Sequence, residues 1–270
     1  MSEHDSIQKS SSPANTDSLA ADLTTLGLQA GMTVIVHSSL SRLGWVNGGA
    51  VAVILALETV LGPSGTLVMP THSSDLSDPA DWQDPPVPEA WWQIIRDTMP
   101  AYEPDLTPTR GMGVIPETFR KCQSVRRSTH PQMSFAAWGA NAEFVTAHHA
   151  LNYGLGEGSP LARLYDLDAW VLLLGVGHGN NTSLHLAEYR ATWPSKHTVQ
   201  LGTSMLVDGQ PAWVNFPDIG IDTSDFETIG EAFNQSGHVC QGTVGIGSAL
   251  FFRQRPLVDF AAEWMSTHRK

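Results

Sequence analysis

The sequence predicts an α/β protein in which helices cover both faces of a sheet. Residues 170–174, WVLLL, form a short, continuous apolar run, which is typical of a strand buried on both faces. Residues 33–69 alternate between a β-branched strand, an apolar helix and a second strand, the unit from which parallel sheets are built. With 270 residues and 41% hydrophobic content, the chain can bury a large core within one domain.

The overall composition is acidic and poor in cysteine. Its 15 basic and 27 acidic side chains give a formal charge of −12, which argues against a general nucleic-acid surface and suits a cationic ligand, although solubility alone also explains it. Cys122 and Cys240 fit no disulfide framework or zinc motif, so a reducing cytoplasm is expected. No apolar run reaches the length of a signal peptide or a membrane span, so no contact with the membrane is expected.

Regular structure is expected from residue 16 onward. Residues 1–15 are polar and serine-rich, which predicts a mobile tail before a single domain of residues 16–270. In the first half, apolar spacing and turn residues predict a helix over 19–28, a strand over 33–36, a helix over 50–61 and a strand over 66–69. In the second half they predict strands at 198–201 and 205–207, a turn at Asp208-Gly209, a helix over 226–233, an extended segment over 240–246 and a helix over 257–265.

A glycine-containing loop joins the first predicted strand to the next helix. It begins at His37, Ser38 and Ser39 and ends near Gly48. The first N–H groups of a helix have no partner within it, so this loop could hold a phosphate group. No GxGxxG or GxxxxGK[ST] motif is present, which favours a purely structural turn as the explanation of the glycines.

Residues 72–109 are predicted to form a long ordered flap. Seven prolines are expected to interrupt regular structure there, and three tryptophans need a surface on which to pack. Several aspartates, Asp75 and Asp78 among them, give the flap a negative charge. Solvated loop aspartates account for this charge as well as a substrate wall does.

The one dense basic cluster consists of Lys121, Arg126 and Arg127, followed by Ser128. Arginine makes bidentate contacts with phosphate, and an adjacent serine can add a hydrogen bond. The cluster therefore indicates an anion site, with a solvated basic face as the alternative.

The residues that follow the apolar run at 170–174 are the strongest candidates for chemistry. Asn181 or Thr182 can cap a helix that Pro194 ends, and Thr182, His185 and Glu188 recur at three-residue spacing on it. This spacing puts an imidazole and a carboxylate on one helical face, close to the carboxyl end of a strand, where open α/β sheets bind ligands.

Five motifs together resemble a known family. They are HSSL at 37–40, GTLVMPT at 65–71, RRSTHP at 126–131, GSP at 158–160 and LLLGVGHGNNTSLHLAE at 172–188. Their order and spacing resemble the aminoglycoside 3-N-acetyltransferases from about residue 19 to residue 253, and the last motif is the most specific. The segments SDPADW and PPVPEAWW resemble a branch of that family with little or no known antibiotic activity, which leaves the substrate open.

The resemblance implies a three-layer α/β/α fold with a central mixed sheet, distinct from the GNAT acetyltransferases. It implies acetyl transfer from acetyl-CoA to the 3-amino group of a 2-deoxystreptamine aminoglycoside, giving antibiotic resistance, with no metal. The coenzyme contacts expected on this basis are His37, Ser38, Ser39, Leu40, Gly48, Arg127 and Ser128. The expected contacts with the cationic substrate are Asp75, Asp78, Trp82, Glu188, Asp218 and Asp222.

The reaction that the resemblance implies needs a base for the attacking amine. His185 matches the family's helix histidine and is the expected base, and either Glu188 or Asp218 would orient it. Backbone N–H groups near Ser38 or Ser39 are expected to stabilise the thioester oxygen. Direct transfer within a ternary complex is expected, because neither cysteine has a base beside it in sequence.

Three alternatives remain open from sequence. The acceptor could be another amine, with the same fold and donor. His178, His185 and Glu188 could ligate a metal in a hydrolase, although no HExxH spacing is present. The chain could also bind a cationic ligand without turnover. A homodimer is left open, because the sequence is silent on assembly.

Overall fold

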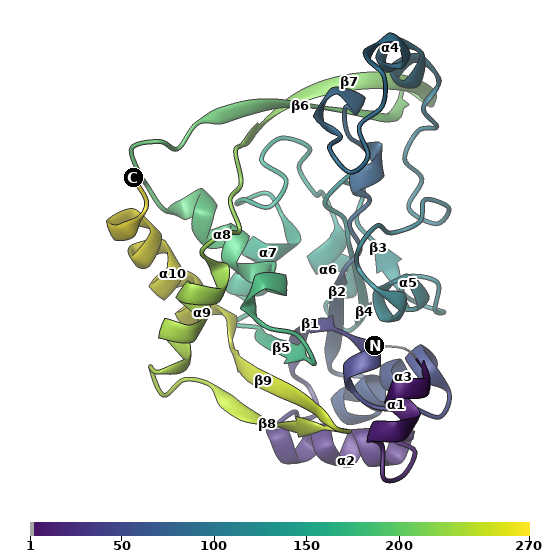
Figure 1. Ribbon diagram of the computed structural model, residues 1–270, viewed down its shortest axis with the longest axis vertical. Helices are drawn as coiled ribbons and strands as arrows, with labels where there is room; N and C mark the ends of the chain where they lie inside the picture. Colours follow the sequence, from purple (N-terminus) through teal and green to yellow (C-terminus); the bar gives the residue numbers. More distant parts are fainter. Residues whose placement is uncertain (1–2) are drawn as a thin grey trace.

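The computed structural model describes residues 3–270 and forms one mixed sheet, a separate hairpin and helices around them (Figure 1). The strands are β1 (Thr33–Ser38), β2 (Thr66–Pro70), β3 (Arg126–Arg127), β4 (Phe135–Gly139), β5 (Trp170–Leu174), β6 (Thr198–Val207), β7 (Gln210–Ile219), β8 (Cys240–Val244) and β9 (Gly247–Arg253). The α-helices are α1 (Glu3–Lys9), α2 (Thr16–Leu26), α3 (Gly49–Leu61), α4 (Glu89–Thr98), α5 (Val114–Phe119), α6 (Ala142–Thr146), α7 (Pro160–Asp166), α8 (Ser183–Arg190), α9 (Phe226–Asn234) and α10 (Gln254–His268).

The main sheet has the strand order β3-β4-β2-β1-β5-β9-β8. The strand β1 pairs in parallel with both β2 and β5, whereas the outer pairings are antiparallel. In the register of β1 with β5, Ser38 stands opposite Leu174. The carboxyl ends of β1 and β5 therefore meet at one edge of the sheet, where ligands bind in open α/β folds.

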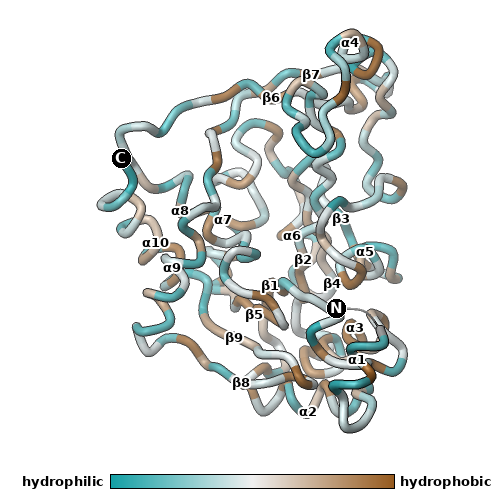
Figure 2. The backbone as a smooth tube through the Cα atoms, viewed as in Figure 1, coloured by the Kyte–Doolittle hydropathy of each residue, from teal (hydrophilic) through white to brown (hydrophobic). Residues whose placement is uncertain are grey.

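Two apolar cores lie on opposite faces of this sheet and make the fold three-layered. Alternate residues of a strand point to opposite faces, so Val34 and Val36 join the core under α2, α3 and α5, whereas Ile35 joins the core under α6 to α10. In Figure 2 the apolar segments concentrate where the central strands meet these helices. The predicted three-layer fold with a central mixed sheet is thus confirmed.

Residues 3–15, the described part of the segment expected to be a mobile tail, contain regular structure. Residues 3–9 form α1, and Ala14 forms a bridge with Val46. The Ala14 N–H donates to the Trp45 carbonyl, and the Asn47 N–H donates to the Ala14 carbonyl. These backbone hydrogen bonds join the segment to the loop before α3, and a polar composition does not reveal such bonds.

The hairpin of β6 and β7 stands apart from the main sheet as a two-stranded sheet. Its turn residues Asp208 and Gly209 both have positive φ, 51° and 77°, as the predicted Asp-Gly hairpin turn requires. The two strands expected at 198–201 and 205–207 are one continuous strand, because all ten residues of β6 pair with β7.

The predicted flap contains a helix that the proline pattern hid. The prolines at positions 85, 86, 88 and 100 flank residues 89–98, and these ten residues form α4. In Figure 1, α4 lies beside the β6–β7 hairpin at one end of the molecule. The Ser204 hydroxyl donates to the Met99 carbonyl, and the Tyr102 N–H donates to the Ser204 carbonyl, so the hairpin anchors the flap. None of the helices within residues 3–270 is long and apolar enough to cross a membrane.

Candidate active site

An imidazole–carboxylate pair lies on α8, directly after the carboxyl end of β5. His185 Nδ1 lies 2.6 Å from Glu188 Oε2. Glu188 is fully buried, and the side chain of His185 retains 11% of its exposure. Because Nδ1 faces the carboxylate, its proton is held there and Nε2 is left as the basic nitrogen. The ring of His185 also packs edge-on against Phe226, at 4.9 Å between centroids.

The second oxygen of Glu188 is also held by hydrogen bonds. Oε1 accepts from the Asp222 N–H at 2.9 Å and from Arg269 Nη1 at 2.8 Å. The Lys196 ammonium donates to three carbonyls at the end of α8, including that of Glu188. A cation is favourable at this helix terminus. Hydrogen bonds therefore fix both the side-chain carboxylate and the backbone carbonyl of Glu188.

Asp218 is not a partner of His185, which corrects one of the two expected orienting carboxylates. Its carboxylate accepts from the Tyr189 hydroxyl and from the N–H groups of Gly154 and Ile219. The aspartate sits at the end of β7 and joins the hairpin to α8 and to the loop before α7. Of the two expected carboxylates, Glu188 is the one that contacts His185.

Two further histidines, the buried His37 and the partly buried His72, lie near His185 at the carboxyl ends of β1 and β2. Burial, with nearby imidazoles including His185 as a smaller cause, lowers the pKa of His37 and of His72 to about 3 in each case. Both rings are therefore neutral at physiological pH. Their Nε2 atoms are buried and have no hydrogen-bond partner among the described residues. Such orphaned polar atoms mark a place where a ligand can complete the bonding.

A cavity of about 1360 Å³ opens next to these strand ends. The expected coenzyme contacts Ser38, Ser39 and Leu40 line it, whereas His37 does not. Its two cationic side chains are Lys9 and Arg42, and no acidic residue lines it within residues 3–270. In a chain with a net charge of −12, an acid-free cavity with two cations favours an anionic ligand.

The helix α3 begins at this cavity. Gly48, with φ of 86°, is its N-cap and makes no side-chain cap, and Gly49 lines the cavity. The Gly49 N–H donates to the Val46 carbonyl, and no N-cap side chain bonds the N–H groups that follow it, at the point where an anion would gain from the helix dipole. The Ser39 N–H, in contrast, donates to the Leu174 carbonyl, so it is not the free oxyanion donor that was expected. The Ser38 hydroxyl is buried and unpartnered among the residues described.

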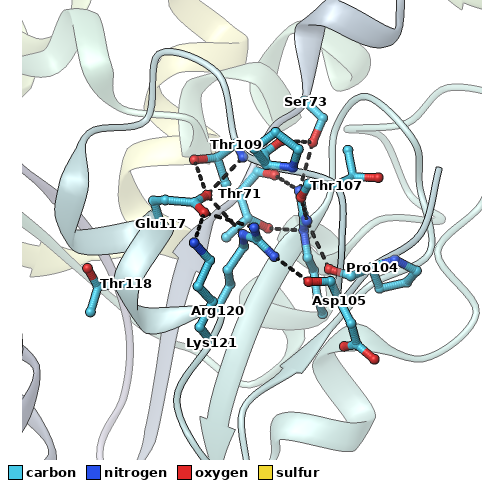
Figure 3. A network of polar contacts seen from close by, with 12 residues as sticks. Thr71, Ser73, Pro104, Asp105, Thr107, Thr109, Glu117, Thr118, Arg120 and Lys121 are labelled. Carbon is cyan, nitrogen blue, oxygen red and sulfur yellow. Dashed lines mark hydrogen bonds and ion pairs between the residues drawn. The ribbon is translucent and has the colours of Figure 1, made fainter. Parts of the chain in front are cut away.

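Arg127 fastens the flap, and the cavity next to the strand ends is not lined by Arg127 or Ser128, the two residues of the basic cluster expected at the coenzyme. The Arg127 guanidinium donates to the carbonyls of Pro104 and Thr107 and to the Ser73 hydroxyl, and its remaining acceptors are on Thr71 and Ser134. Ser128 is buried and bonds to His149 and to the Phe135 N–H. Figure 3 shows the network at the flap base, which Glu117 and Arg120 extend.

The flap side chains expected to bind substrate have partners within the flap. Asp78 forms a bidentate ion pair with Arg96 and caps Ala80. Asp75 pairs with Arg110 at the surface, at 3.4 Å, and the Trp82 indole donates to Ser77. These contacts give Asp78 and Trp82 a structural role. The Asp222 N–H donates to the Glu188 carboxylate, and the Asp222 carboxylate accepts from the Ser224 N–H. Asp222 therefore supports Glu188 and does not line the cavity next to the strand ends.

The alternative set of metal ligands is not assembled. The ring of His178 stacks on Phe252, and its Nε2 meets Asn234 Oδ1 at 3.1 Å. Its backbone N–H and that of Gly179 donate to Glu227, which fixes the loop after β5. In the part of the chain that the structure describes, no group of three or more His, Cys, Asp or Glu side chains is placed to hold a metal ion.

Sequence reasoning missed four parts of the site. Lys9 lies in the segment that was expected to be mobile, and Arg42 follows HSSL without a motif of its own. The segment 111–115 lines the cavity from the end of the flap, where its GMG glycines were the available signal. Arg269 reaches Glu188 across 81 residues, and no local pattern could indicate that contact.

The chain is similar to known proteins over nearly its whole length. The family model described as aminoglycoside 3-N-acetyltransferase matches residues 35–266. The SPbeta prophage-derived aminoglycoside N(3')-acetyltransferase-like protein YokD of Bacillus subtilis is 46% identical over 96% of this chain and 94% of its own. Aminoglycoside N(3)-acetyltransferase VII of Streptomyces paromomycinus is 38% identical over the same shares.

Solved structures agree with the sequence comparisons. The crystal structure of YokD has a TM-score of 0.96 and covers 98% of both chains. The structure of AAC-IIIb binary with CoASH has a TM-score of 0.84 at 33% identity and covers 94% of this chain and 97% of that one. The fold is therefore that of an acetyltransferase class distinct from the GNAT enzymes. The chain belongs to the aminoglycoside 3-N-acetyltransferase family.

Proposed function

We propose that the protein transfers an acetyl group from acetyl-CoA directly to an amine of a cationic aminoglycoside, with His185 as the general base. The acceptor we propose is the 3-amino group of a 2-deoxystreptamine aminoglycoside, whose acetylation would give antibiotic resistance. The observation that carries this proposal is the buried His185–Glu188 pair on α8, because the loop between β5 and α8 lines the acid-free cavity with two cations.

The cavity suits the donor. Acetyl-CoA carries a pyrophosphate and a 3′-phosphate, and Lys9, Arg42 and the N-terminus of α3 supply positive charge and N–H donors for them. The coenzyme bound in the AAC-IIIb structure supports this assignment. The Ser38 hydroxyl, buried and lining the cavity, is the donor we assign to the thioester oxygen.

The chemistry follows from the tautomer of His185. The amine nitrogen attacks the thioester carbonyl carbon, and His185 Nε2 accepts the proton that the nitrogen loses. Glu188 stabilises the resulting imidazolium through Nδ1. The tetrahedral intermediate then breaks its C–S bond, which gives the amide and the coenzyme thiolate, and the thiolate takes up a proton from the imidazolium.

Transfer without an acyl-enzyme agrees with the position of both thiols. Cys122 packs against the core under α3, and burial raises the pKa of its thiol. Cys240 is exposed on β8. Neither side chain lines the cavity. A low thiol pKa and a neighbouring base are what a nucleophilic cysteine needs, so the amine itself is the nucleophile in our proposal.

The test measures coenzyme A release from acetyl-CoA with gentamicin, kanamycin, neomycin and apramycin, beside a control without amine. We expect turnover with some of these acceptors and its loss in His185→Asn, which keeps a polar side chain of similar size. Mass spectrometry would then place the acetyl group on the ring. If acetyl-CoA binds but no aminoglycoside is acetylated, the acceptor is another amine. If acetyl-CoA does not bind, the donor assignment fails as well.

A further inference from the structure

Arg269, the penultimate residue, reaches from the end of α10 to the carboxylate of Glu188. Its Nη1 donates to Glu188 Oε1 at 2.8 Å. Its Nε and Nη2 grip the carboxylate of Asp225 at 2.7 and 2.6 Å, and Nη2 also donates to the Asp222 carbonyl at 2.7 Å. The guanidinium stacks over Trp193, and its side chain is 8% exposed. All three nitrogens of the guanidinium are therefore engaged in fixed contacts.

Glu188 needs this partner because it is fully buried. A buried carboxylate is costly unless hydrogen bonds and opposite charge compensate it. Its three hydrogen-bond donors are His185, the Asp222 N–H and Arg269. The charge of His185 changes during the proposed reaction and the Asp222 N–H is neutral, so Arg269 is the donor that carries a constant positive charge.

We propose that Arg269 is a positioning residue, which keeps Glu188 ionised and aimed at His185 throughout turnover. The inference rests on the proposed function of His185 as a base, and it adds a residue beyond the stretch 35–266 that the family model matches. Asp225 and the Asp222 carbonyl hold the far side of the guanidinium, so Nη1 stays directed at Glu188 Oε1. The other carboxylate oxygen then points at Nδ1.

A second cavity makes this role testable by chemical rescue. This cavity has a volume of about 630 Å³, and Arg269 lines it together with Trp193, Trp264 and His268. Replacing Arg269 by alanine would extend this cavity toward Glu188. A free guanidinium ion, which is small and planar, could then enter from solvent and restore the missing charge and hydrogen bonds.

The kinetic experiment compares Arg269→Ala and Arg269→Lys with the wild type. We expect R269A to lower kcat roughly 10- to 100-fold, because a misdirected base loses its alignment, with little change in either KM. R269K keeps the positive charge but lacks the planar set of N–H donors of a guanidinium, so it should retain intermediate activity. Millimolar guanidinium chloride should restore part of kcat in R269A only. Arg253→Gln, which removes a half-exposed ion pair with Asp168, is the matched control and should leave kcat unchanged.

A second readout does not depend on turnover. A proton held between His185 Nδ1 and Glu188 at 2.6 Å should give a downfield imidazole resonance, assigned by its loss in His185→Asn. In R269A or R269K this resonance should shift or broaden, and R269K carries the test should R269A not fold. Unchanged kcat and an unchanged resonance in R269K would overturn the inference. The inference would also be overturned if R269A lost thermal stability and affinity for both substrates and guanidinium did not restore its kcat. Wild-type inactivity with an intact resonance would count only against the proposed function.

Discussion

His185 and Glu188 lie three residues apart on α8, and their side chains meet at 2.6 Å although residues three apart on a helix can also diverge. The contact is made because Oε1 of Glu188 is pulled to the opposite side by Arg269 and the Asp222 N–H, which turns Oε2 toward the imidazole. The pair is therefore held by the tertiary structure as well as by helical spacing.

Glu188→Gln should lower kcat by roughly 10²- to 10⁴-fold, because the amide cannot stabilise the imidazolium and allows the wrong tautomer. It also leaves Arg269 facing a neutral group. Coenzyme A release measures kcat, and thermal unfolding checks the fold. Glu157→Gln removes the exposed partner of Arg190 and serves as the control, with kcat expected to stay unchanged. Equal activity of both variants would remove Glu188 from the mechanism.

Arg127→Ala should lower stability and not coenzyme affinity. Its guanidinium donates to the carbonyls of Pro104 and Thr107, and the loss of these hydrogen bonds leaves partly buried acceptors without this donor. We expect the free energy of unfolding to fall by about 2–4 kcal/mol and the KM for acetyl-CoA to stay unchanged. Urea unfolding and steady-state kinetics measure the two quantities. Arg126→Ala, which removes an exposed contact with Glu143, should change neither. A KM effect confined to R127A would return Arg127 to the coenzyme site.

The parts of the fold that local sequence determines were predicted well. The buried strand at 170–174 appears with those bounds, because a continuous apolar run bounded by Gly175 has few other structures open to it. The helix expected over 50–61 is α3, which ends at Leu61 as expected. His185 and Glu188 were found for the same reason, since their relation is set by one turn of helix.

The parts that depend on distant contacts could not be predicted. The local sequence around Arg127 predicts a phosphate ligand, because a local pattern does not indicate hydrogen-bond partners that lie 7 to 56 residues away. Asp218 was one of two carboxylates expected to contact His185. It contacts the Tyr189 hydroxyl instead, because the end of the β6–β7 hairpin lies beside α8. The proline pattern does not predict α4, because prolines interrupt regular structure, yet those at 85, 86, 88 and 100 lie outside residues 89–98.

Arg42→Ala and Lys9→Ala should weaken coenzyme binding. A charge-assisted hydrogen bond is worth about 1.5–3 kcal/mol, so each variant should raise the Kd for acetyl-CoA roughly 10-fold or more. Calorimetry measures Kd, and its dependence on salt should be shallower in the variants, since fewer phosphate charges are neutralised. Arg126→Ala lies outside the cavity and is the control. Unchanged affinity in the Lys9 and Arg42 double variant would refute the assignment of the phosphate contacts.

Buried neutral histidines should make the protein lose stability as the pH falls below about 6.5. His130 Nδ1 accepts the N–H groups of Gln132 and Met133, and burial lowers the pKa of His130 to about 4. Between the unfolded pKa of about 6.5 and this value, the unfolded chain binds a proton that the folded chain does not, so its contribution is full above 6.5 and declines toward 4. His37 and His72, with pKa values of about 3, act in the same direction.

The expected slope is roughly 1.4 kcal/mol of unfolding free energy per pH unit for each such histidine. Urea unfolding at intervals from pH 7.5 to pH 5 measures it, in a window where carboxylates of ordinary pKa stay ionised. His130→Asn keeps an acceptor near the two N–H groups and removes the titrating ring, so its slope should be shallower by about the contribution of one histidine. An identical slope in the wild type and in H130N would show that folding does not lower the pKa of His130. The acid sensitivity would then have to come from other groups.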